Sequence, residues 1–331
     1  MWTQRSTVPG AWAIAVAMVA ITAALAGSIL GSAAADAQTV IRVGKAQANQ
    51  FGFVPADVGV DTGIFKKLGL DVTISSFAGD AKLLQALTAG GVDIALGGGP
   101  ALAAIVKGAP MKAVAVTIDA PNIIMLVVLK DGPVRSVADL KGRPVSVSTE
   151  GSLTYWLTQQ LSRLQGWGDD GIRITPLGAS QAQIAALQTR QVDGVTTDSV
   201  TVHKFVATGA GRILVKFGDY IKNFHSGFIY ASNKLITSDP AALRAFVAGW
   251  FEAVAFMRDH RRTTIEIAVK HTGVSPAVAD EGYDDTMPVM SVDGRFKAKA
   301  LDVLAASFVD THALPAKPDM SKLLTDAFLP K

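Results

Sequence analysis

Two segments of this chain, residues 71–95 and 171–195, are versions of one another. The first reads DVTISSFAGDAKLLQALTAGGVDIA and the second reads GIRITPLGASQAQIAALQTRQVDGV. They align without a gap at an offset of 100 residues, so that Asp93 corresponds to Asp193. Each copy begins with the alternating pattern of a strand, passes a turn of small residues, and continues as a helix that leads into a second strand. This repeat predicts two similar α/β lobes, and a cleft between such lobes is a common place for ligands.

The composition describes a well-packed globular protein, with 49% hydrophobic and 18% charged residues. A net charge of +3 is too small and too scattered to indicate a nucleic-acid partner. The chain has no cysteine, which excludes disulfides, thiolate metal sites, cysteine nucleophiles and a lipidated bacterial N-terminus.

The first 37 residues have the pattern of a secretory signal peptide. Arg5 provides the positive end, and residues 11–30 are uncharged and strongly apolar. The sequence Ala35-Asp36-Ala37 fits a cleavage site before Gln38. An uncleaved membrane anchor is the alternative, because the apolar run is close to the ~20 residues that span a bilayer. We expect cleavage and export to the periplasm.

The pattern also predicts how the chain divides. Residues 38–131 and 226–331 are expected to form lobe 1, residues 132–225 lobe 2, with crossings near residues 130 and 226. The strand expected at 227–231 returns to lobe 1, and the helical segments after it need the surface of that lobe for packing. These helices are expected at 240–258, 263–271, 276–283 and 296–308, followed by a helical tail after Pro318.

Five segments, taken in order, resemble a known family. They are GIFKKLGLDV at 63–72, ALTAGGVD at 86–93, KGAPMKAVA at 107–115, DLKGRPVSVS at 139–148 and ALQTRQVDG at 186–194. Together they resemble the periplasmic solute-binding proteins of ABC importers for nitrate, sulfonates, taurine and thiamine-pyrimidine precursors. The resemblance implies a type II periplasmic-binding-protein fold, with two α/β lobes that close around a central cleft. Arg190-Gln191 departs from the glycine frequent in that family, and the loop after the first strand lacks the aromatic pair of pyrimidine binders.

The glycine run 97–99, followed by Pro100 and Ala101, is one candidate binding element. It lies where a strand meets a helix, so its backbone N–H groups could hold an anion at the helix N-terminus. A tight strand-to-helix turn is the alternative. The candidate ligand contacts in this element are Gly98, Gly99 and Ala101.

The turn 149–154 occupies the matching place in lobe 2. Its candidate ligand contacts are Thr149, Gly151, Ser152 and Thr154. Thr149 or Ser152 could instead simply cap the helix that follows, although capping and ligand binding are compatible. Glu150 would repel an anion unless it points outward. Because neither loop contains arginine, an anion would have to rely on N–H groups, hydroxyls and helix ends.

Two further groups complete the candidate site. Gln47, Asn49 and Gln50 follow the first strand, where the family places side chains against the ligand, but an ordinary polar loop has the same composition. Asp198 ends a strand of the second repeat and could hold a ligand amine or cap the next helix; the cap is favoured. The histidines and the acidic group near residue 280 have no metal-ligand spacing, so we expect no metal site and no cofactor.

The resemblance implies a non-catalytic importer component that captures a small, anionic organic molecule. Its expected partners are that ligand and an inner-membrane ABC permease with its ATPase, and the protein is expected to be a monomer. A periplasmic ligand sensor is one alternative. An enzyme of the thiamine-pyrimidine synthase type on the same fold is another, weakened because that class uses cysteines and this chain has none.

Overall fold

The computed structural model describes residues 1–2 and 38–331, and residues 38–331 form one compact unit. The expected signal peptide and its cleavage site lie outside the described residues, apart from Met1 and Trp2. The description below concerns residues 38–331.

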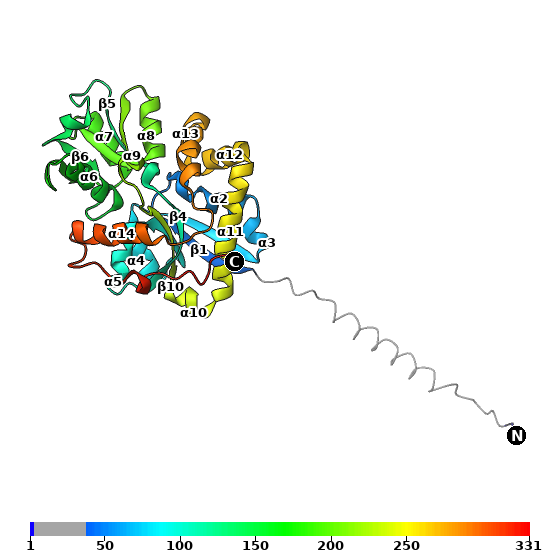
Figure 1. The fold of residues 1–331 in the computed structure, drawn as a ribbon. Coiled ribbons are helices and arrows are strands. Elements are labelled where there is room, and N and C mark those ends of the chain that lie inside the picture. Colours follow the sequence, from blue (N-terminus) through cyan, green and yellow to red (C-terminus); the bar gives the residue numbers. More distant parts are fainter. Residues whose placement is uncertain (3–37) are drawn as a thin grey trace. The chain divides into compact units, whose positions relative to one another are not determined.

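The first sheet has the strand order β2-β1-β3-β10-β4. Its strands are β1 (Thr39–Lys45), β2 (Leu70–Ser76), β3 (Ile94–Gly98), β4 (Met111–Ile118) and β10 (Gly227–Ser232). β1 pairs in parallel with β2 and β3, whereas β10 runs antiparallel to β3 and β4. We call this sheet and the helices that pack on it lobe 1 (Figure 1).

The second sheet has the order β7-β6-β8-β5-β9 and, with its helices, forms lobe 2. Its strands are β5 (Ile124–Leu129), β6 (Pro144–Val147), β7 (Arg173–Pro176), β8 (Gly194–Asp198) and β9 (Gly211–Lys216). β6 pairs in parallel with β7 and β8, and β5 runs antiparallel to β8 and β9. The two sheets therefore share one plan, in which three parallel strands are followed by an antiparallel strand and then by a fifth strand that again runs parallel to the first three.

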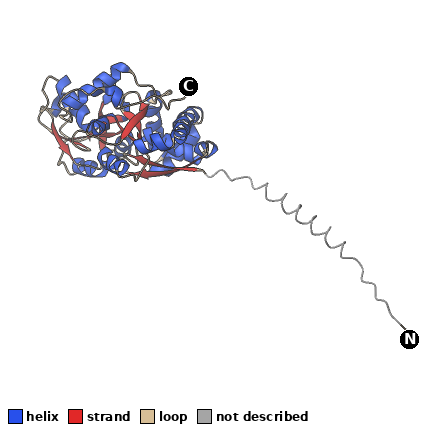
Figure 2. Cartoon of the chain, turned by 90° about the horizontal axis from the view of Figure 1, so that it is seen from below, coloured by secondary structure: helices blue, strands red, loops and turns tan. Residues whose placement is uncertain are grey.

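Helices surround the strands of both sheets (Figure 2). Early in the chain lie α2 (Val54–Asp61), α3 (Ile64–Lys67), α4 (Asp80–Thr88) and α5 (Leu102–Val106). Lobe 2 contains α6 (Leu153–Leu164), α7 (Ser180–Gln188), α8 (Ser199–Ala207) and α9 (Phe217–Tyr220). The C-terminal part contains α10 (Asn233–Ser238), α11 (Pro240–Asp259), α12 (Arg261–Thr272), α13 (Pro276–Thr286) and α14 (Ala298–Asp310).

Both copies of the repeat adopt the strand–helix–strand unit that their pattern predicts. The first copy is β2-α4-β3 and the second is β7-α7-β8. In each copy the aspartate before the second strand forms an ion pair with an arginine outside the copy. Asp93 pairs with Arg42 at 2.7 Å, and Asp193 pairs with Arg143 at 3.2 Å. The Val-Asp pair of the repeat thus marks the entry to the second strand in both lobes.

The first crossing between the sheets differs from its expected position. The prediction places residues up to 131 in lobe 1, but β5 hydrogen-bonds to β8 and β9 of lobe 2. The chain therefore passes from β4 to β5 through residues 119–123, not near 130, and returns through 221–226. The run IMLVVL is almost entirely buried, and an apolar strand of this kind carries no local signal for which sheet it joins.

The C-terminal tail also differs from prediction. After Pro318 it forms only a short 3₁₀ turn at Met320–Lys322. It then runs along the edge strand β4, where Ala113 donates a hydrogen bond to the Leu323 carbonyl and Thr325 donates one to the Ala113 carbonyl. Pairing of this kind covers a sheet edge that would otherwise be open, and it competes successfully with helix formation.

One described helix, α11, is long and apolar enough to cross a membrane by length and composition. Half of its most apolar window is buried within the protein, including Phe246 and Trp250. The hydrophobic character of α11 is therefore accounted for by packing against α2 and α3.

Candidate functional site

The cleft between the lobes holds a small cavity of about 310 Å³ at the carboxyl ends of strands from both sheets. Its lobe 1 wall comes from residues 47–49 after β1 and 76–79 at the end of β2. Its lobe 2 wall comes from Ser148 after β6, residues 178–181 after β7, and Asp198 at the end of β8 with Thr201. The carboxyl ends of parallel strands are the usual ligand position in open α/β sheets.

Half of the residues that line the small cavity are neutral and polar. Gln47, Asn49 and Gln181 contribute amides, and Ser148 and Ser180 contribute hydroxyls. The Oε1 atom of Gln47 is buried and has no hydrogen-bond partner within residues 38–331. A buried acceptor without a partner carries a desolvation cost that a ligand donor would relieve.

Asp198 lies in this cavity wall, but its carboxylate is occupied by the protein. Oδ1 accepts the backbone N–H of Thr201 at 2.8 Å, and Oδ2 accepts the Thr201 hydroxyl at 2.7 Å. Asp198 is thus the N-cap of α8, and only 2% of the residue is exposed. Of the two interpretations that its sequence position allows, the geometry supports the cap.

A cluster of three hydroxyls lies between the strand β6 and the helix α6. Ser148, Ser152 and Thr154 have side-chain oxygens 3.0 Å from one another. Ser152 also donates to the Thr149 carbonyl at 2.7 Å and accepts the Tyr155 N–H as the N-cap of α6. The cluster satisfies its own hydrogens, so a bound acid group would have to reorient at least one hydroxyl.

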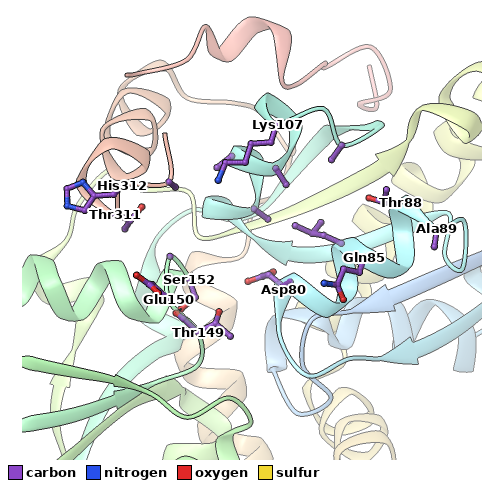
Figure 3. A pocket seen from close by; sticks show the side chains of 18 residues that line it. Asp80, Gln85, Thr88, Ala89, Lys107, Thr149, Glu150, Ser152, Thr311 and His312 are labelled. Carbon is purple, nitrogen blue, oxygen red and sulfur yellow. The ribbon is translucent and has the colours of Figure 1, made fainter. Parts of the chain in front are cut away.

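A larger cavity of about 830 Å³ lies next to the small one (Figure 3). The neighbours Gly79 and Asp80 line one cavity each, as do Ser148 and Thr149. Lobe 1 supplies side chains from α4 and α5, lobe 2 supplies the turn 149–152, and residues 311–313 after α14 close a third side. Many of the lining residues are alanines, whose short side chains leave the volume open.

The glycine run was predicted to offer its backbone N–H groups to an anion, and one of these groups is already bonded within the protein. The N–H of Gly98 already donates to Oδ1 of Asp80 at 2.8 Å, and the Gly98 carbonyl accepts the Tyr230 hydroxyl at 2.7 Å. A Cβ atom on Gly97 would lie 2.6 Å from the same Asp80 oxygen. The glycines therefore make room for a carboxylate of the protein itself, which stands where the anion was expected.

The predicted site residues fall into three groups. Gln47, Asn49 and Asp198 line the small cavity, while Ala101, Thr149, Gly151 and Ser152 line the large one. The remaining four, Gln50, Gly98, Gly99 and Thr154, line neither.

The predicted site residues that line neither cavity have structural roles instead. The Gln50 carbonyl accepts the Phe53 N–H in a 3₁₀ turn, and Thr154 belongs to the hydroxyl cluster. A Cβ on Gly99 would lie 2.8 Å from the His225 carbonyl, so this position needs glycine for close backbone approach.

Charged contacts hold the lobes together beside the cleft. Asp310, at the end of α14, pairs with Arg163 of α6 at 2.5 Å and accepts the indole N–H of Trp156 at 3.3 Å. Asp285 of α13 lies 2.5 Å from the imidazole of His203 in α8. The C-terminal helices thus contact lobe 2 through two helices, α14 against α6 and α13 against α8.

Comparison with known proteins assigns the family. The family model described as "NMT1/THI5 like" matches residues 50–263, which is more than half of the chain. The chain belongs to this NMT1/THI5-like family.

Named relatives agree with this assignment. A relative from Escherichia coli (strain K12) that is named "Putative aliphatic sulfonates-binding protein" is 26% identical over 246 residues, covering 74% of this chain and 76% of the relative. The alkanesulfonate-binding protein SsuA from Xanthomonas axonopodis pv. citri, solved with MOPS bound, has a TM-score of 0.75 at 20% identity, covering 87% of this chain and 98% of that one. The periplasmic nitrate-binding protein NrtA from Synechocystis PCC 6803 has a TM-score of 0.73 at 14% identity, covering 88% of this chain and 87% of that one.

These similarities bear on several predictions. The two-lobed α/β fold is that of periplasmic binding proteins, as the resemblance implies. The relatives are solute-binding proteins of the periplasm, which supports a solute-binding role and a periplasmic location for this NMT1/THI5-like chain.

Asp80 is the cleft residue that sequence reasoning missed. It is the first residue of α4, and it follows Gly79, whose φ of 100° places it in the left-handed region. In the repeat it corresponds to Ser180, which also begins a helix and also reaches the end of the adjacent strand, at Asp198. The sequence did contain a signal for this residue. At the start of the helix the first repeat copy has a carboxylate, Asp80, where the second copy has a hydroxyl, Ser180.

Proposed function

We propose that this protein is the extracytoplasmic solute-binding component of an ABC importer. It captures a small organic molecule between its two lobes and delivers it to a permease and ATPase in the inner membrane. The observation that carries the proposal is that both cavities are lined by both lobes. A ligand that contacts both lobes stabilises the closed form over an open one, and that difference is the signal a permease reads.

The cavity volume favours an organic ligand over a bare inorganic ion. Ligand sites for organic molecules usually measure about 300–1,000 Å³, and both cavities fall in that range. An acid group on the ligand would meet the turn 149–152 at the N-terminus of α6, where the helix dipole favours negative charge. Thr149 and Ser152 provide the hydroxyls of this turn that line the large cavity.

A thermal-shift screen tests the binding role directly. The purified protein is heated with sulfonates, nitrate, taurine, aromatic acids and pyrimidines. A ligand at a hundred times its Kd adds about 2.7 kcal/mol to the free energy of unfolding, which corresponds to a rise in Tm of roughly 5–10 °C. Where part of the ligand-free protein is open, small-angle scattering should show that the radius of gyration falls when the ligand is added. The absence of a shift with every compound class would contradict a solute-binding role.

Ser152→Asp examines the site. A carboxylate at the α6 N-terminus would occupy the place of the ligand acid group, so binding of an acidic ligand should fall well over tenfold, and Ser152→Ala should cost roughly tenfold. Ser275→Ala is the matched control, because Ser275 caps α13 with the same geometry but lines neither cavity. It should lower stability by about 1 kcal/mol and leave the affinity unchanged. Equal affinity in Ser152→Asp and the wild type would remove the turn from the site.

Uptake by cells separates transport from sensing. A strain lacking this protein should lose high-affinity uptake of the ligand found in the screen, and the wild-type gene should restore it. Unchanged uptake together with a lost transcriptional response to the ligand would favour the sensor.

A further inference from the structure

The large cavity contains a carboxylate that the protein leaves without a cation. Asp80 accepts one hydrogen bond within the described residues, from the Gly98 N–H to Oδ1, and forms no ion pair there. Burial raises the pKa of Asp80, and the Gly98 hydrogen bond opposes this rise only in part. A desolvated carboxylate without a neighbouring cation is unfavourable for folding and is therefore a candidate for a binding role.

The surroundings of Asp80 are built for it. A Cβ on Gly98 would lie 3.2 Å from Oδ2 of Asp80 and 3.8 Å from Cβ of Leu153 in lobe 2. The absence of side chains at Gly97 and Gly98 thus places the carboxylate at the contact between the lobes. In that position it faces any ligand that enters the large cavity (Figure 3).

The other charged side chains of the cavity make it less favourable for a ligand that is only an anion. Glu150 of the lobe 2 turn adds a second carboxylate, and Lys107 at the end of α5 adds an ammonium group that forms no ion pair within residues 38–331. Two carboxylates and one ammonium leave the lining with net negative charge while His312 is neutral. Apolar side chains from Ala81 and Leu84 of α4 and from the two alanines of α5 also line this cavity, beside the polar side chains of Gln85 and Thr88.

We infer that Asp80 determines specificity by binding a protonated amino group of the ligand. The ligand is then a zwitterion, an amine joined by a short apolar spacer to an acid group that meets Lys107 and the 149–152 turn. This inference deepens the proposed function, because it names the substrate class of the same cleft.

Matched ligand pairs test the inference by isothermal titration calorimetry on the purified protein. The pairs are 6-aminohexanoate with hexanoate and 2-aminoethanesulfonate with ethanesulfonate. Each amino compound should bind about 10- to 100-fold more tightly than its partner, because a charge-assisted hydrogen bond has that effect on affinity. Tighter binding of the compounds without an amine would overturn the inference and leave the solute-binding role intact.

The variant Asp80→Asn isolates the charge. Its amide oxygen keeps the acceptor for the Gly98 N–H, so the fold is preserved while the amino compounds lose about 10- to 100-fold in affinity. The compounds without an amine should bind unchanged or more tightly. Asp71→Asn is the control, since Asp71 is an exposed carboxylate of the same repeat copy on β2 and lines neither cavity. Amine binding that survives Asp80→Asn would overturn the inference, and failure of the full screen above to find any ligand would overturn it together with the proposed function.

Discussion

The two copies of the repeat share a backbone and differ in where each places its carboxylate. In lobe 2 the strand β8 ends in Asp198, and the helix α7 begins with Ser180. In lobe 1 the arrangement is exchanged, because the helix α4 begins with Asp80 and the strand β3 ends in Gly98. Asp198 is occupied as a helix cap, whereas Asp80 has one hydrogen bond and no cation within the described residues. The comparison teaches that a repeated scaffold can keep one copy structural and free the other for a ligand.

The strands that open the two lobes differ in a second way. Val43 pairs with Ile74 and Ile94 as Val145 pairs with Ile174 and Gly194, so the two valines are equivalent. Counting onward from them, Lys45 corresponds to Val147 and Asp57 to Gln159.

These equivalent positions have opposite character. Lys45 and Asp57 form a buried ion pair, with 5% and 2% of their side chains exposed. Gln159 is uncharged, and its buried Oε1 has no partner within residues 38–331. Lobe 1 thus carries a buried charge pair where lobe 2 carries none.

The largest expected effect comes from breaking that ion pair. Asp57→Asn leaves the Lys45 ammonium buried without a counter-charge, which should lower the free energy of unfolding by about 3–5 kcal/mol. Urea denaturation followed by circular dichroism measures it. The double variant Lys45→Met with Asp57→Leu should recover most of the loss, and Gln159→Met in lobe 2 should change stability by less than about 1 kcal/mol. A loss below about 1 kcal/mol in Asp57→Asn would show that the lobes do not differ in this respect.

A smaller effect is expected at Asp198. Asp198→Ala removes the N-cap of α8 and leaves the Thr201 N–H without its acceptor, so stability should fall by about 1–2 kcal/mol. Asp198→Asn keeps an acceptor oxygen and should lie within about 0.5 kcal/mol of the wild type. Both values come from urea denaturation, and ligand affinity is measured beside them. If Asp198→Asn were stable but bound the ligand far more weakly, the carboxylate would be a ligand contact, and the contrast with Asp80 would fail.

The smallest effect is expected when Asp80 is replaced by asparagine and the stability of the ligand-free protein is measured. Because burial raises its pKa, the folded state favours the protonated carboxyl, and stability is lost as the pH rises through the folded-state pKa. Asp80→Asn does not titrate, so at pH 7 it should be more stable than the wild type by about 1 kcal/mol. The difference should shrink as the pH falls toward the ordinary range of an aspartate.

Thermal unfolding between pH 4 and pH 8 measures this difference. Tyr230 lies beside Asp80 and stays neutral in this range because burial raises its pKa well above the usual value. Lys107, Glu150 and His312 line the same cavity in both the wild type and the variant, so the comparison of the two proteins isolates Asp80. A variant less stable than the wild type at pH 7 would indicate that Asp80 is a structural carboxylate like Asp198.

Much of the fold follows from local sequence. The repeat predicts β2-α4-β3 and β7-α7-β8 because alternation and helical periodicity are set by neighbouring residues. The long helix α11 begins at the predicted Pro240 for the same reason, since proline suits the first turn of a helix. The prediction of a helical tail after Pro318 was wrong, because the conformation of the tail is set by pairing with Ala113, some two hundred residues earlier in the chain.

The sequence by itself determined the two-lobed plan, the family and the candidate loops, because these depend on periodicity, turn residues and ordered motifs. Only the tertiary structure decided which sheet β5 joins and which carboxylate is left without a cap or a cation within the described residues. Strand pairing and desolvation are properties of residues far apart in the chain, so Asp80 and Asp198 look alike as letters. They differ because Thr201 occupies one carboxylate with two hydrogen bonds, while the other meets only the N–H of Gly98 beside an open cavity.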